Sequence, residues 1–282
     1  MNTNQGQARV ERLDYQPYDG PLEPLAGRFL VVAGHQLRLS RKDKWFRRLL
    51  WFSFFPLGIF AVMVIVQSKV EQIGNHGFNL WSPFWGAQIF SAILITYLCG
   101  RSTIGEDLRT GAASVYFARP VTLNGYLGGK WLSVFVPVLF VTLGPALLLI
   151  SFRFAIEPGA GLLSFLRWLA GFLAASILLS AVMGAVMLAV SSLTRRARTA
   201  GFLWIGFIIG MSALANGLAK SFDDPIYTVI SFTRASARLL AYLVEGKGSA
   251  DMAAMDALSH IVWLVIGLGI VRFRIAAGKT RV

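Results

Sequence analysis

The 282-residue chain has little of what soluble enzymes and metalloproteins depend on. Charged residues make up 15% of it, whereas soluble domains contain about a quarter. A single cysteine, Cys99, excludes an intramolecular disulfide and a cysteine-rich metal site. The three histidines, His35, His76 and His260, share no ligand spacing. The sequence therefore gives no sign of a metal centre.

Signals for catalysis are equally weak. Asp223 and Asp224 stand directly before a proline, a pattern that is typical of a turn rather than of a catalytic carboxylate pair. Residues 277–280 (AGKT) resemble the end of a phosphate-binding loop, but Phe273 stands where that loop needs a glycine. An apolar run also precedes them where the loop needs a strand. We therefore expect no enzyme activity, no ATPase site and no cofactor in this chain.

What the chain has in abundance is hydrophobic residues, which make up 55% of it, with a mean hydropathy of +0.60. Six apolar runs approach the roughly 20 residues that a helix needs to cross a bilayer. They cover residues 49–66, 83–100, 131–152, 162–193, 200–219 and 258–271. We predict an all-α polytopic membrane protein with six transmembrane helices, the third kinked at Pro137 and Pro145. No Asp or Glu falls within these limits, which weighs against an ion-coupled carrier.

The segments before the first span differ in character. Residues 1–27 are polar and rich in proline and glycine, and we interpret them as a mobile cytoplasmic arm. Residues 28–48 mix apolar side chains with basic ones, among them Arg38, Arg41 and Lys42, and include Trp45. This composition suits a connecting helix in the headgroup layer, although a solvated basic linker is the alternative. Residues 49–275 would then form the transmembrane domain and 276–282 a cytoplasmic tail.

The distribution of positive charge predicts the orientation. The net charge is +13, and we attribute it to anionic lipid rather than to nucleic acid as the partner. With the N-terminus inside, 20 of the 27 lysines and arginines fall on the inner side. The positive-inside rule then places both termini in the cytoplasm of a multi-pass protein of the inner (plasma) membrane.

Two further patterns leave alternatives open. The connection 220–257 is too polar to span but contains apolar residues, so we predict one or two short helices in the outer leaflet. An ordinary extracellular loop is the alternative. Small residues recur at helical spacing at Gly206 and Gly210, and along the fourth span at Ala181, Gly184, Ala185 and Ala189. Such strips mark either a dimer seam or packing within the bundle.

Residues 105–130 form a polar island of both charge signs between the second and third spans. We expect a short helix within 112–118 that ends at Pro120. The orientation above makes this island cytoplasmic, which suits it to docking a soluble partner.

At this island the chain resembles the membrane subunits (permeases) of type-2 ABC transporters. The residues that carry the resemblance are Glu106, Thr110-Gly111, Arg119-Pro120-Val121, Tyr126 and Gly129-Lys130. The basic, tryptophan-bearing segment before the first span, the six spans and the long outer loop before the last span also fit that family.

The resemblance implies a permease that pairs with a second copy or a paralogue and docks on a separate cytoplasmic ABC ATPase. A coupling helix around 106–117 would make the contact, with Glu106 holding it by a polar contact. The docking residues would be Glu106, Asp107, Arg109, Thr110, Gly111 and Arg119. ATP and Mg would be bound by the ATPase, and the cargo would be exported. The alternative is a permease-like anchor, or a maturation or regulatory subunit, that transmits force without moving cargo.

Overall fold

The computed structural model describes residues 27–72, 79–112, 122–157 and 161–279. Within these ranges the secondary structure is helical and contains no strand. Six helices in the same ranges are long and apolar enough to cross a membrane. The predicted fold class, an all-α polytopic membrane protein, is therefore confirmed. The predicted N-terminal arm lies outside the described residues except for Gly27.

The segment before the first span is divided, whereas we had predicted one helix over 28–48. Helix α1 (Arg28–Lys42) ends at Asp43, whose backbone is extended. The Asp43 carboxylate accepts a hydrogen bond from the Trp45 N–H at 2.8 Å and caps the next helix, α2 (Lys44–Phe52). Helix α3 (Phe55–Gln72) continues the first span. The basic residues of α1 and Trp45 of α2 therefore belong to different helices.

The second and third spans are longer or more continuous than expected. Helix α4 (Trp81–Gly100) is followed by the short helix α5 (Gly105–Thr110) and then by α7 (Leu123–Ile156). Helix α7 begins well before the predicted Trp131 and contains both Pro137 and Pro145 without a break in its helical residues. Neither proline therefore divides this span.

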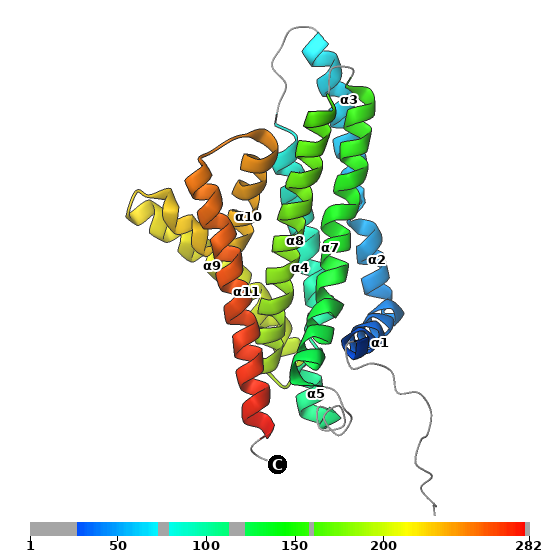
Figure 1. Cartoon of the computed structure of the whole chain (residues 1–282), viewed down its shortest axis with the longest axis vertical. Coiled ribbons are helices and arrows are strands. Elements are labelled where there is room, and N and C mark those ends of the chain that lie inside the picture. Colours follow the sequence, from blue (N-terminus) through cyan, green and yellow to red (C-terminus); the bar gives the residue numbers. More distant parts are fainter. Residues whose placement is uncertain (1–26, 73–78, 113–121, 158–160, 280–282) are drawn as a thin grey trace, which may run out of the picture.

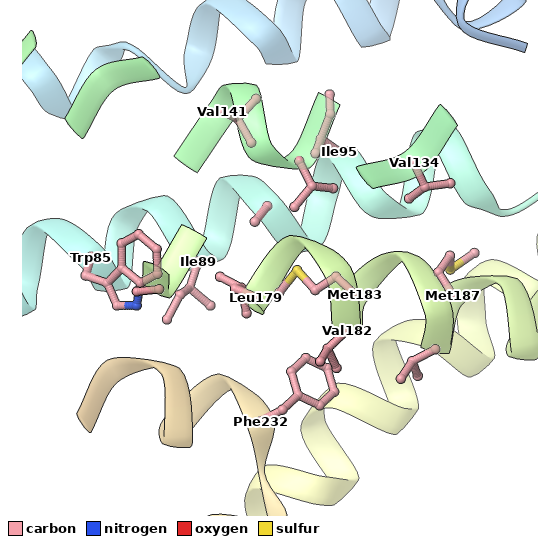
Figure 2. Packing of buried hydrophobic residues seen from close by; sticks show 14 of the residues in the cluster. Trp85, Ile89, Ile95, Val134, Val141, Leu179, Val182, Met183, Met187 and Phe232 are labelled. Atoms are coloured by element: carbon pink, nitrogen blue, oxygen red, sulfur yellow. The ribbon is translucent and has the colours of Figure 1, made fainter. Parts of the chain in front are cut away.

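Helix α8 (Leu162–Leu193), whose limits match the predicted fourth span, is the centre of the bundle. In the most apolar 18-residue stretch of α8, 78% of the residues are buried, whereas in that of α9 (Ala197–Ser221) 17% are buried. Figure 2 shows the side chains of α8 between those of α4 and α7 on one side and Phe232 on the other. A helix so covered packs against protein over most of its surface.

Close contacts decide the role of the small residues in α8. A Cβ on Gly184 would lie 3.3 Å from the Trp131 ring, and one on Gly267 would lie 2.8–3.0 Å from Ala185 atoms. The strip in α8 therefore serves packing within the bundle. Gly206 and Gly210 on α9 face open space instead.

The connection between the last two spans is helical, as predicted. It contains the 3-10 helix η2 (Pro225–Ile230), helix α10 (Phe232–Leu240) and the π-helical turn η3 (Ala241–Glu245). Helix α11 (Ala250–Lys279) then begins well before the predicted Leu258. Asp256 consequently lies inside a candidate span of the structure, although it falls outside the limits predicted for the sixth span.

Figure 1 shows α1, α5 and the last residues of α11 gathered at one end of the bundle. We call this the α5 end. The end of α3 and the start of α11 point the other way. The predicted tail from residue 276 continues α11 as far as Lys279.

Candidate functional site

Helix α5 is a six-residue helix that is seated on the end of α8. The backbone N–H groups of Ile104 and Gly105 both donate to the Ser191 hydroxyl oxygen at 3.2 Å. A Cβ on Gly105 would lie 2.8 Å from the Ser191 carbonyl oxygen and would overlap that of Thr194. Gly111, with φ of +73°, ends the helix in the left-handed region that favours glycine. Glycine thus allows both the close seating and the sharp end of α5.

The bundle-facing side of α5 carries a buried ion pair. The Asp107 carboxylate lies 2.8 Å from Lys130 Nζ and accepts a hydrogen bond from the Tyr126 hydroxyl at 2.6 Å. Lys130 Nζ also donates to the Thr103 carbonyl and to Gln36 Oε1, both at 3.1 Å. We call these five residues the Lys130 cluster. It joins α5, α7, α1 and the link between α4 and α5.

Burial makes the Lys130 cluster a strong constraint. The side chain of Lys130 is 2% exposed and that of Asp107 is 15% exposed. A buried ammonium group is costly unless a counter-charge and hydrogen-bond acceptors surround it. These partners come from separate helices, so α5 cannot leave its position without exposing or orphaning the lysine. The cluster therefore fixes α5 relative to α1 and α7.

The opposite side of α5 is exposed and carries both charge signs. Glu106 and Arg109 form an ion pair one helical turn apart, and the Thr110 hydroxyl donates to the Glu106 carbonyl at 2.9 Å. Exposed pairs of this kind contribute little to stability because water screens them. Their charges are thus available to a partner at small cost to the fold.

The structure brings most of the predicted docking residues together. Glu106, Asp107, Arg109 and Thr110 lie in α5, and Gly111 follows directly. Arg119 lies outside the described residues, as does nearly all of the helix predicted over 112–118. The described helix covers residues N-terminal to that prediction. Tyr126 and Lys130 were part of the recognised pattern, but Lys130's pairing with Asp107 was not foreseen.

The predicted interfacial residues also lie at the α5 end (Figure 1). Arg38, Arg41 and Lys42 are exposed on α1. Trp45 is exposed at the start of α2, and the Arg48 guanidinium lies 5.5 Å from its ring centre. A tryptophan beside several cations is the composition found at membrane–water interfaces.

A second polar group, on α11, was not predicted. The fully buried Asp256 carboxylate pairs with Arg238 of α10. The Ser259 hydroxyl donates to the Val229 carbonyl at 2.7 Å, and Trp263 Nε1 donates to the Ile230 carbonyl at 3.0 Å. The spacing of these α11 residues follows one helical face, and that periodicity was a usable signal. The predicted sixth span begins at Leu258, so Asp256 falls outside it and the pattern stays incomplete.

This second group attaches the η2–α10 segment to the bundle. Two further bonds act in the same way: Arg167 Nε donates to the Leu243 carbonyl at 3.0 Å, and Trp85 Nε1 donates to the Ser236 hydroxyl at 3.1 Å. The bond of Trp85 is buried, and polar groups buried among apolar helices are stable only when paired, so this bond specifies one docking position, whereas the bond of Arg167 is exposed. The segment is therefore held by α4, α8 and α11.

The α5 end joins an exposed, charged helix to long apolar helices. In the part of the chain that the structure describes, no group of three or more His, Cys, Asp or Glu side chains is placed to hold a metal ion. The most distinctive feature is a short helix that exposes one acidic and one basic side chain, Glu106 and Arg109, and is joined to long apolar helices through the buried Lys130. Comparison with models of protein families and with curated proteins gives no match for this chain.

Proposed function

We propose that this chain is the membrane-spanning subunit of an ATP-binding cassette transporter, coupling ATP hydrolysis by a separate ATPase subunit to export of a cargo. The observation that carries the proposal is the attachment of α5 through the Lys130 cluster. A charged helix at the tip of the bundle, between α4 and α7, is the feature that such a subunit needs for docking. The resemblance at Glu106, Thr110-Gly111 and Tyr126 to Lys130 supports the same assignment.

The mechanism follows from how α5 is attached. A partner that displaces α5 also displaces Asp107, and the Lys130 cluster passes that motion to α7 and α1. Because helices are stiff and their cores are densely packed, displacement at one end tilts the whole element. ATP and Mg would be bound by the partner. Cargo that favours one arrangement of the spans must in return bias the ATPase, since coupling between two sites is reciprocal.

The proposal includes an orientation and a second membrane subunit. In this proposal the α5 end lies on the cytoplasmic side of the inner membrane, because the basic residues of α1 and of 195–198 gather there. The second subunit is another copy or a paralogue. The low burial of α9 and the open space beside Gly206 and Gly210 support pairing along that helix.

Docking is tested with the double substitution Glu106→Ala/Arg109→Ala on the full-length chain. The chain is co-expressed with ABC ATPase subunits of its own organism, and the retained complex is quantified together with its ATP hydrolysis in lipid vesicles. We expect binding to weaken by about tenfold, the scale of losing interface residues that carry binding energy. The pair is exposed, so the chain's own thermal stability should stay unchanged.

The matched control removes one base and one acid from the opposite end, as Lys69→Ala/Asp251→Ala, and should retain the complex. Full binding and full ATPase activity in the α5 variant would refute the docking assignment. A complex that hydrolyses ATP but moves no cargo in any reconstitution would favour the alternative, a permease-like anchor or regulatory subunit.

A further inference from the structure

A pocket of about 520 Å³ opens between α4 and α9, towards the α5 end of the bundle. Its walls are mainly apolar and include Leu94, Phe202 and Ile205. Phe202 is 79% exposed, so the pocket is open at its side. It shares no residue with α5, the Lys130 cluster or the α11 polar face, although Phe202 and Ile205 belong to α9, the helix along which a second subunit is proposed to pair.

Two arginines line this pocket, Arg101 just after the end of α4 and Arg198 in the first turn of α9. Neither has an ion-pair partner among the residues that the structure describes. The N-terminus of α9 has no side-chain cap there, and a helix N-terminus adds positive potential. The pocket thus combines uncompensated positive charge with an apolar wall.

The arginine at the end of α4 is held in place by its neighbours. Arg101 Nη1 donates to the Tyr97 hydroxyl at 3.0 Å, and its guanidinium lies 5.0 Å from the Tyr97 ring centre. Gly201 of α9 lies so close to that ring that a Cβ would overlap it. Trp204 Nε1 donates to the Ile93 carbonyl at 3.1 Å and fastens α9 to α4 beside the pocket. Packing therefore fixes Arg101 and the wall between α4 and α9, and Arg198 is the exposed cation beside them.

We propose that this pocket binds the headgroup of an anionic phospholipid, with the phosphate between Arg101 and Arg198 and an acyl chain along Leu94, Phe202 and Ile205. Guanidinium groups bind phosphate oxygens through charge-assisted hydrogen bonds. Basic pockets between membrane helices suit anionic headgroups. A free anion would use the arginines but leave the apolar walls uncovered, so the walls favour a lipid. This inference stands whether or not the chain is a transporter subunit.

The test measures lipid binding to the purified full-length chain in neutral detergent by native mass spectrometry. The probes are palmitoyl-oleoyl phosphatidylglycerol, the matching phosphatidylcholine and inorganic phosphate. We expect phosphatidylglycerol to bind in preference to the other two. Each arginine near anionic lipid contributes about fivefold in affinity, so Arg198→Gln should weaken binding about fivefold and Arg101→Gln/Arg198→Gln about 30-fold.

The matched control is Lys220→Gln/Arg234→Gln, which removes the same charge from exposed side chains of α9 and α10 that do not line the pocket. It should bind phosphatidylglycerol like the unchanged chain. Three results would overturn the proposal: an equal loss in this control, equal binding of phosphatidylcholine, or equal binding of inorganic phosphate. The Arg198→Gln variant keeps the test decisive if loss of Arg101 impairs folding, because Arg198 is exposed and makes no contact that the bundle needs.

Discussion

At the scale of single residues, charges that stand side by side in the sequence have opposite roles. Glu106 and Arg109 pair in water on one side of α5, whereas Asp107 reaches the buried Lys130 on the other. The first pair contributes little to stability because solvent screens it. Breaking the second pair is costly, because Lys130 left alone is a buried charge.

This difference predicts the effect of Asp107→Asn. The amide can still accept from Tyr126, but it cannot neutralise Lys130. Breaking a buried ion pair by removing one partner destabilises by about 3 kcal/mol. We therefore expect a clear fall in the midpoint of thermal unfolding, which is measured by intrinsic fluorescence in detergent.

The companion variant is Asp107→Asn/Lys130→Met, which removes both charges and keeps a long side chain in the cavity. Because the charge that was orphaned is gone, most of the lost stability should return. The double variant should therefore be more stable than Asp107→Asn alone. An Asp107→Asn chain as stable as the unchanged protein would mean that Lys130 finds its counter-charge elsewhere.

At the scale of elements, the attachment of α1 depends on one glycine of α7. A Cβ on Gly129 would lie 2.6 Å from the Phe29 carbonyl oxygen and 2.7 Å from Val32 Cβ. The neighbouring Gly128 has nothing within 4 Å of its Cβ position. These adjacent glycines of α7 thus differ in purpose: Gly129 allows α1 and α7 to touch, whereas Gly128 faces open space.

We therefore expect Gly129→Ala to destabilise the chain by about 1–3 kcal/mol, the usual cost of overpacking. Gly128→Ala should be neutral or stabilising by about 0.5–1 kcal/mol, because alanine suits a helix better than glycine does. Thermal unfolding compares the two, and hydrogen exchange of α1 locates the change. Equal effects of the two substitutions would contradict the close contact between α1 and α7.

At the scale of the whole molecule, the positive charge gathered at the α5 end predicts how the bundle sits in the membrane. Cys99 is buried, and it is the chain's only cysteine. With Cys99 replaced by alanine, single cysteines can report each end. Thr110 of α5 and Ser249 before α11 are both exposed in the structure.

A membrane-impermeant maleimide added to intact cells should react with the thiol of Ser249→Cys. Thr110→Cys should react only after the membrane is opened with detergent, since the positive-inside rule places α5 in the cytoplasm. The detergent-treated sample controls for reactivity of each thiol. Labelling of Thr110→Cys from outside would reverse the orientation and would exclude docking of a cytoplasmic ATPase on α5.

The sequence predicted some of this architecture well because hydrophobicity and length act locally. The fourth span was predicted at its limits, since Leu162–Leu193 is largely apolar, with Arg167 as its one charged residue, and ends before three arginines. The sixth span was predicted too short, since Asp256 looks like a loop residue until Arg238 is known to lie beside it. The docking residues followed from the resemblance, whereas Gln36 and Thr103 of the Lys130 cluster have no local signal.

By itself, the sequence determined that the protein is all-α and that six helices in its described part are able to cross a membrane, because each span's solvent preference is a property of its own residues. Only the tertiary structure decided which charges are buried and paired. Asp107 meets Lys130, and Arg238 meets Asp256, across helices that are separate in the chain. The energy of a buried charge depends on groups brought close by packing, so no local pattern contains it.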